Sequence, residues 1–129
     1  MTITHVNPDS LHKNPAFSQG VVVEGPGRFV FVGGQNGVDG EGRVVADDLA
    51  AQTRQALLNL IAVLDAAGAT PADVVTMNVN LVAPADITAA FPVVAEVWGP
   101  HPAAVTVLQV TDLGPEGALV EISATAFIS

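Results

Sequence analysis

Segments with strand character make up much of this sequence, and only two segments have helical character. Strands are predicted over residues 18–24, 28–32, 43–45, 74–82, 103–110 and 118–127. Helices are predicted over about residues 47–68 and 87–98. Two helices cover only one face of a sheet of five to six strands. The order of these strands and helices along the chain therefore predicts an α/β (α+β) fold with both helices on one face of the sheet and the other face open.

Local signals define the helix over residues 47–68 most clearly. Asp47 and Asp48 suit a helix N-terminus, where carboxylates meet the positive end of the dipole. Apolar residues then recur at helical spacing until Gly68, which is a common helix stop. Pro92 interrupts the second helix and indicates a kink or a later start, because an interior proline removes a backbone hydrogen bond.

The N-terminal part of the chain carries weaker signals. Residues 1–16 are polar, contain two prolines, and are predicted to form an irregular arm. The strands at 18–24 and 28–32 flank a Gly-Pro-Gly turn, which predicts a hairpin between them. Residues 33–37 are glycine-rich but lack the phosphate-loop pattern, so we expect their backbone to line a cleft instead.

The last strand shows why the open face of the sheet needs cover. One face carries Val120, Ile122, Ala124 and Ala126, and the other carries Leu119, Glu121, Ser123, Thr125 and Phe127. The second face is thus mixed, not fully polar. Charged residues make up 13% of the chain, against roughly a quarter in an average soluble domain, while 50% is apolar. We therefore expect other subunits to bury this face, so the chain should form a homo-oligomer.

Composition and charge exclude several other classes of protein. A length of 129 residues suits a single domain covering residues 1–129. The net charge is −9 and the four Lys and Arg are scattered, which disfavours nucleic acid and membrane as partners. Without cysteine, and with three histidines at no metal-ligand spacing, we expect no metal site. No leader peptide and no apolar run of ~18 residues is visible, so a cytoplasmic location is expected.

Short motifs in a fixed order point to a family. They are residues 15–20, 29–35, 52–60, 64–68, 73–75, 101–103 and 117–122. In these segments the chain resembles the reactive intermediate deaminase family, called Rid or YjgF, over nearly its whole length. The resemblance implies a chorismate-mutase-like homotrimer with a small-molecule cleft between each pair of subunits. Members of this family hydrolyse reactive enamines and imines and need no cofactor.

The resemblance also implies which residues form the site. A glutamate on the last strand of the family positions the water, and this position is Glu121 here. The candidate substrate-binding positions are Phe17, Gly33, Gly34, Phe91, Ala104 and Thr106. Phe91 lies in none of the family motifs, and its alternative role is in the core or in an interface. The structural alternative for Glu121 is a hydrogen-bonded residue that holds a subunit interface.

Three of these positions depart from the pattern of the family. Ala104 stands where an arginine clamps the substrate carboxylate, Phe17 replaces a tyrosine, and Gly33 replaces a serine. Hydrogen bonds to charged groups are worth about 1.5–3 kcal/mol each, so losing two costs roughly 3–6 kcal/mol. That loss corresponds to about 10² to 10⁴ in affinity. We expect weak or absent activity on imino acids.

Three functions remain open at this point. The chain is a member without the arginine that performs hydrolysis or tautomer chemistry through Glu121, with no cofactor. Alternatively, it is an enamine/imine deaminase of the 2-iminopropanoate type, in which another group binds the carboxylate. The third is a non-catalytic protein that binds or senses a small molecule. The scattered basic residues give no support to a ribonuclease.

Overall fold

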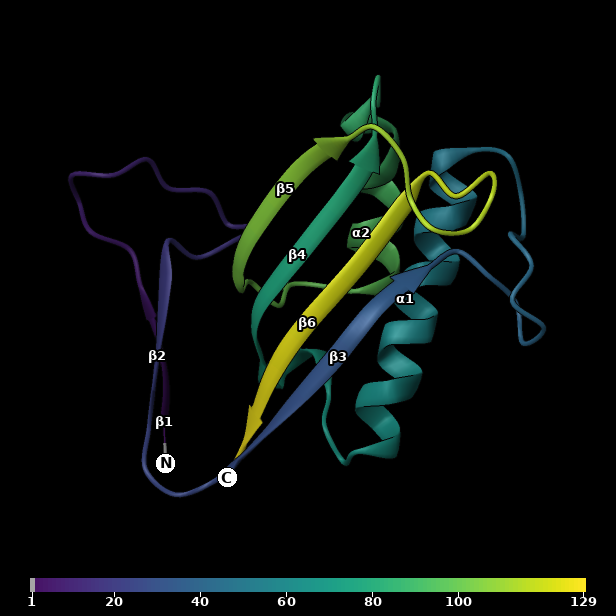
Figure 1. The fold of residues 1–129 in the computed structure, drawn as a ribbon. Helices are drawn as coiled ribbons and strands as arrows, with labels where there is room; N and C mark the ends of the chain where they lie inside the picture. Colours follow the sequence, from purple (N-terminus) through teal and green to yellow (C-terminus); the bar gives the residue numbers. More distant parts are fainter. Residues whose placement is uncertain (1) are drawn as a thin grey trace.

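The computed structural model describes residues 2–129 and contains, within that range, six strands and two α-helices (Figure 1). The strands are β1 (Thr2–Val6), β2 (Gly20–Glu24), β3 (Arg28–Asn36), β4 (Val74–Val82), β5 (Ala104–Val110) and β6 (Val120–Ile128). The helices are α1 (Leu49–Ala66) and α2 (Phe91–Val97), with 3₁₀ turns at Pro71–Asp73 and Ile87–Ala90. The predicted α+β fold with two helices is confirmed.

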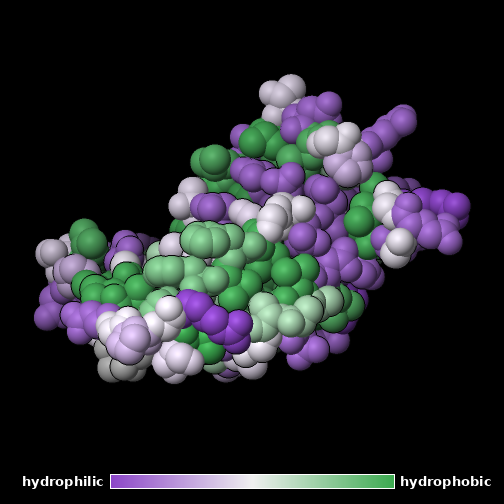
Figure 2. Space-filling model, turned by 60° about the horizontal axis from the view of Figure 1, so that its bottom comes forward, coloured by the Kyte–Doolittle hydropathy of each residue, from purple (hydrophilic) through white to green (hydrophobic). Residues whose placement is uncertain are grey.

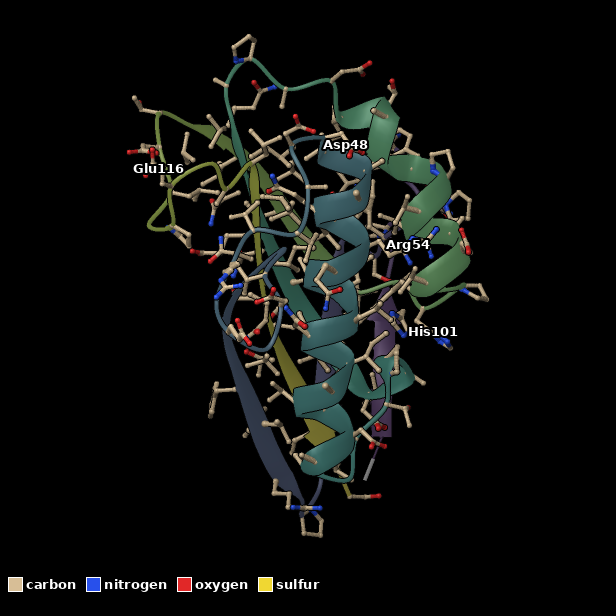
Figure 3. The ribbon with its side chains drawn as sticks, turned by 90° about the vertical axis from the view of Figure 1, so that its right-hand side faces the viewer. Asp48, Arg54, His101 and Glu116 are labelled. Atoms are coloured by element: carbon tan, nitrogen blue, oxygen red, sulfur yellow. The ribbon has the colours of Figure 1, made fainter. Side chains whose placement is uncertain are left out.

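Four of the strands form one mixed sheet in the order β3-β6-β4-β5. Strands β4 and β5 are parallel, whereas β6 is antiparallel to both of its neighbours. Both α-helices lie on one face of this sheet, as the side view in Figure 3 shows for α1. The opposite face carries no helix within the subunit, as the element order predicted; we call it the open face.

The other two strands form a separate antiparallel ribbon, with Thr2 opposite Glu24 and Val6 opposite Gly20. This ribbon lies beside β5 in Figure 1, apart from the four-stranded sheet. The prediction of an irregular arm is therefore wrong for β1; Met1 lies outside the described residues. The prediction of a hairpin between residues 18–24 and 28–32 is also wrong, because β2 pairs with β1 and β3 pairs with β6.

Long-range packing explains why β3 pairs with β6. Val32 of β3 is 4% exposed and belongs to the core, opposite Ala124 of β6. A hairpin with β2 would supply pairing but not this contact with the core. The predicted strand at 43–45 is reduced to one bridge between Val38 and Val44.

Helix α1 provides most of the helical side of the core. Asp48 caps it, since its Oδ2 accepts a hydrogen bond from the Ala51 N–H at 3.0 Å, and Figure 3 shows Asp48 at one end of the helix. Gly68 follows the helix with a φ of 81°, a left-handed conformation that favours glycine. Leu57 and Leu60 are at most 1% exposed, and burying each contributes about 1.5–3 kcal/mol. These results confirm the predicted helix.

Helix α2 begins later than the predicted segment. Residues Ile87–Ala90 form a 3₁₀ turn, which Asp86 caps by accepting from the Thr88 N–H at 3.1 Å. Pro92 lies in the first turn of α2, where a missing N–H costs no hydrogen bond. The later start, one of the two predicted possibilities, is thus observed. Within residues 2–129, no helix is both long and apolar enough to span a membrane.

Candidate functional site

Rows of side chains cross the open face of the sheet. Strand pairing aligns Thr125, Thr76 and Ala104 in one row, Ser123, Asn78 and Thr106 in the next, and Glu121, Asn80 and Leu108 in a third. Glu121 belongs to this face because side chains alternate along β6, and its neighbours Val120 and Ile122 are in the core. The open face is therefore polar over β4 and the adjoining part of β6.

The Glu121 carboxylate lies directly over the backbone of Gly34. A Cβ built on Gly34 would lie 2.6 Å from Cδ of Glu121 and 2.7 Å from its Oε1. Such distances are far below van der Waals contact, so only glycine leaves room for the carboxylate here. A Cβ on Gly33, in contrast, would meet no atom within 4 Å. The structure thus brings Gly34 and Glu121 together, whereas the space where a Gly33 side chain would stand is open.

The basic side chains are engaged away from Glu121. Lys13 pairs with Asp9 at 2.6 Å, Arg43 with Glu41 at 2.9 Å and Arg54 with Glu96 at 2.7 Å, and Arg28 donates to the Ala67 carbonyl at 3.1 Å. Over the described range no Lys or Arg forms an ion pair with Glu121. The Glu121 carboxylate therefore has no Lys or Arg counter-ion among residues 2–129 of its own subunit.

Arg54 joins the two helices at the surface. Its Nη1 and Nη2 donate to the two carboxylate oxygens of Glu96 at 3.2 and 2.7 Å, and Figure 3 shows Arg54 between α1 and α2. This hydrogen bond, and then the charge attraction, lowers the pKa of Glu96 and raises the pKa of Arg54. Both groups are exposed, on the helical side of the molecule. Arg54 is therefore a surface link between helices and not part of the open face.

A cavity of about 320 Å³ lies on the open face at the beginning of β5. It is lined by Phe17, Ser18, Gln19, Thr76, Asn78, Ala104, Val105 and Thr106. Three predicted substrate-binding residues, Phe17, Ala104 and Thr106, thus meet in one place. We call this hollow the polar cavity, because most of its lining side chains carry hydroxyl or amide groups.

Ser18 and His5, which were not among the predicted site residues, hold Phe17 against β5. The Ser18 N–H donates to the Ala103 carbonyl at 2.8 Å, and Ser18 forms a parallel bridge with Ala104. Ser18 Oγ lies 2.6 Å from Nδ1 of His5 on β1. These contacts attach the ribbon to the sheet and fix one wall of the polar cavity. His5 and Ser18 are 13 positions apart in the sequence, so no local sequence pattern predicts their contact.

The predicted site residues do not all converge within one subunit. Glu121 lies on β6 and Thr106 on β5, with β4 between them. Neighbouring strands lie about 4.8 Å apart, so roughly 10 Å of sheet separates the two positions. Phe91 lies on α2, across the sheet from the open face, and is 56% exposed. The described part of the chain also contains no cluster of three or more His, Asp or Glu that could hold a metal ion.

Three comparisons relate this arrangement to known proteins. A family model described as endoribonuclease L-PSP matches residues 8–128. A RutC family protein of Pyrococcus horikoshii is 37% identical over 102 residues, which are 78% of this chain and 80% of that protein. A RutC family protein of Pyrococcus abyssi is 35% identical over 112 residues, covering 86% of this chain and 85% of the other.

Solved structures show the same likeness in three dimensions. A protein of unknown function of the conserved Rid family from Yersinia pestis superposes with a TM-score of 0.87 at 35% identity. The match covers 99% of this chain and 100% of that one. RidA from an Antarctic Psychrobacter gives a TM-score of 0.71 at 29% identity, over 90% of this chain and 97% of the other. The likeness thus extends over almost the whole chain.

Proposed function

Because the chain belongs to the endoribonuclease L-PSP family, with Rid and RutC proteins among its relatives, we propose that it is a homotrimeric enzyme with small-molecule clefts between subunits. Each cleft takes a substrate that has a C=N bond or an enamine and no carboxylate. Glu121 directs hydrolysis of that substrate, and imino acids are handled poorly.

The position of Glu121 carries this proposal. Its carboxylate lies over Gly34 on the open face, without a counter-ion from its own subunit. An anionic group in that position attracts a cationic ligand group such as a protonated imine. It disfavours a carboxylate, because burying two negative charges together without a cation is costly.

Hydrolysis follows from one carboxylate and one water. Glu121 takes a proton from the water as its oxygen attacks the carbon of the protonated C=N bond, and the π electrons move to nitrogen. That proton returns to nitrogen, and Glu121 then takes the remaining hydroxyl proton as the carbonyl forms and the C–N bond breaks. The proton held by Glu121 passes to the released amine or ammonia, which leaves as the ammonium ion. One imine and one water thus give one carbonyl compound and one amine or ammonia, without an oxidant. For an enamine, Glu121 first takes up a proton from solvent and delivers it to the enamine carbon, which gives the same protonated C=N bond.

Separation of the two groups of site residues supports a cleft made by two subunits. A small imine at Glu121 cannot reach across roughly 10 Å of sheet to the walls formed by Phe17 and Thr106. The open face also exposes Phe29 and Phe31, at 51% and 76%, and their rings stack 5.9 Å apart. Figure 2 shows hydrophobic side chains gathered on the lower side of the molecule. A second subunit that covers these phenylalanines would bring its own polar cavity near Glu121.

Ala104 sets the expected substrate class. It lines the polar cavity at the position where the resemblance places a carboxylate-binding arginine, and the four basic residues are engaged elsewhere. The same observation argues against RNA as the substrate. RNA binding needs several clustered cations to displace counter-ions from phosphates, and the chain has four Lys and Arg against thirteen Asp and Glu.

Replacing Glu121 with glutamine tests the proposal directly. The probe is ethanimine, formed in the assay from ethylamine by an amine oxidase; its matched control is 2-iminopropanoate, which differs by a carboxylate. We expect the wild-type protein to accelerate acetaldehyde release from ethanimine, and Glu121→Gln to reduce that acceleration by about 10² or more, as for loss of a general base. Size-exclusion chromatography should show an unchanged oligomer.

Each other outcome assigns a different function. Preference for 2-iminopropanoate would identify the carboxylate-binding deaminase of the family. Thermal-shift binding of amines or imines without acceleration of either substrate would identify a non-catalytic binding protein. Unfolding of Glu121→Gln would assign this glutamate to the structure of the interface, and would contradict its catalytic role.

A further inference from the structure

A second cavity, of about 310 Å³, lies on the helical side of the sheet and is partly open to the surface, since its lining residues Phe91 and Val107 are 56% and 42% exposed. Its floor includes Met77 and Val79 of β4 and Val107 of β5, and its walls include Leu57 of α1 together with Phe91 and Val94 of α2. We call it the apolar cavity. Because side chains alternate along β5, Val107 points to the opposite side of the sheet from Thr106 in the polar cavity.

The lining of the apolar cavity defines what it can hold. None of its lining residues is Lys, Arg, Asp or Glu, and nearly all are aliphatic or aromatic. The polar lining residues are Asn14, Thr53 and His101, so a charged ligand would lose its hydration there without gaining a carboxylate, a lysine or an arginine as a partner. Thr53, at 4% exposure, also lines this cavity, and its Oγ1 is buried without a hydrogen-bond partner among residues 2–129. The chemistry of the walls thus suits a neutral, mostly apolar molecule.

The volume of the apolar cavity limits the size of the ligand that it can hold. Apolar cavities of about 150 Å³ stay dry and bind one benzene molecule. The cavity here has about twice that volume, which matches two fused rings. An empty space of this size leaves its lining atoms without dispersion contacts on one side, so a ligand that fills it gains those contacts.

The segment before β2 provides an entrance. Asn14, Ala16 and Phe17 line the apolar cavity and belong to this segment, in which residues 7–16 are exposed. Phe17 also lines the polar cavity, so this residue borders both hollows. A loosely packed segment can move to admit a ligand, whereas the helices and the sheet stay in place.

We propose that the apolar cavity binds a neutral bicyclic molecule with at most one hydrogen-bonding group, on the side of the sheet away from Glu121. This site is separate from the clefts between subunits and does not depend on hydrolysis by Glu121. Occupancy fixes the ring of Phe17, which is also a wall of the polar cavity.

Titration with indole and naphthalene tests this site. Calorimetry measures the binding, and methyl NMR of the valines shows which residues the probe contacts. We expect both probes to bind the wild-type protein and to shift the signals of Val79 and Val94. Val79→Phe fills the cavity and should weaken binding at least tenfold. Thr106→Phe is the matched control, because it places the same ring on the opposite side of the sheet, and it should leave binding within about twofold.

Several results would overturn the proposal. Absence of binding to the wild-type protein up to the solubility of naphthalene would show that the cavity closes or is filled by the protein itself. Equal binding by Val79→Phe, or loss of binding in Thr106→Phe, would place the probes elsewhere. Circular dichroism checks that Val79→Phe folds; if it does not, Val94→Phe fills the cavity from α2 and takes its place in the comparison.

Discussion

At Gly34 the absence of a side chain determines where the Glu121 carboxylate lies. Alanine at this position would place its Cβ 2.6 Å from Cδ of Glu121, and the flexible carboxylate would have to move. The φ angle of Gly34 is not in the left-handed region, so the backbone itself accepts alanine. We therefore expect Gly34→Ala to fold normally and to lose about 10² in turnover, since a displacement near 1 Å costs that much.

Gly33→Ala is the control for this prediction. A Cβ on Gly33 meets nothing within 4 Å in the subunit, and its φ is equally ordinary. Steady-state rates on ethanimine and thermal melting of both variants are the measurements. Equal rates for Gly34→Ala and the wild-type protein would contradict a catalytic Glu121, whereas a large fall in melting temperature would show that this contact is structural.

Ala104 gives a second test on the scale of one residue. Replacing it with arginine, together with Phe17→Tyr, restores the two groups that the family resemblance places in the cleft. A bidentate arginine–carboxylate contact provides roughly 3–6 kcal/mol, so activity on 2-iminopropanoate should rise by about 10² to 10⁴. The rate on ethanimine, which has no carboxylate, should change little. No gain on the imino acid would mean that the cleft differs in more than the arginine.

Some site residues were predicted from the sequence, and others were not because they come together only when distant strands pair. Gly34 and Glu121 lie in short motifs, whereas Ala104 and Thr106 follow the motif at residues 101–103. Strand alternation and pairing place Glu121, Ala104 and Thr106 on the open face. His5 and Ser18 meet only after β1 folds against β2, so their contact was not predicted, although Ser18 lies in the motif at residues 15–20. No periodicity encodes a contact that depends on such folding.

Between elements, the Arg54–Glu96 pair links α1 to α2 at the surface. The hydrogen bond from Arg54 lowers the pKa of Glu96 below its ordinary 4.5, so the folded state binds this proton less readily than the unfolded state. The stability from the pair is therefore present above pH 4.5 and is lost as the pH falls through the lowered pKa. Because the pair is exposed, its effect should be small and screened by salt.

Glu96→Gln measures this contribution. The variant should melt slightly below the wild-type protein at pH 7 in low salt, and the difference should shrink in high salt and disappear in acid. Urea unfolding across that pH range provides the measurement. A difference that persists in strong acid would mean that Glu96 stabilises the protein through packing and not through its charge.

The elements also show where prediction from sequence stops. The start and end of α1 were predicted because Asp48 and Gly68 act within one turn of the helix. The partner of β2 was predicted wrongly as the strand at residues 28–32, because the valines of β2 suit pairing with either β1 or β3. The burial of Val32 against β6 determines that β3 pairs with β6 and not with β2. This contact joins residues about ninety positions apart.

For the whole molecule, the open face is the main reason to expect an oligomer. Phe29 and Phe31 are exposed there beside Phe127, whose ring is 4.8 Å from that of Phe29. The polar cavity and Glu121 lie on the same face but at different places. Their surfaces differ, so an interface that joins one to the other is head-to-tail, which is the type of interface that a closed ring such as a trimer requires. The trimer and the single domain stay predictions that follow from this face and from the family resemblance.

Mixing two inactive variants tests most directly whether Glu121 works in a cleft between subunits. Glu121→Gln removes the carboxylate, and Thr106→Phe blocks the polar cavity. If each cleft combines Glu121 of one subunit with Thr106 of the next, unfolding and refolding an equal mixture should restore about a quarter of the wild-type rate on ethanimine, because half of the subunits carry each intact residue. A mixture as inactive as its two components would contradict a shared cleft.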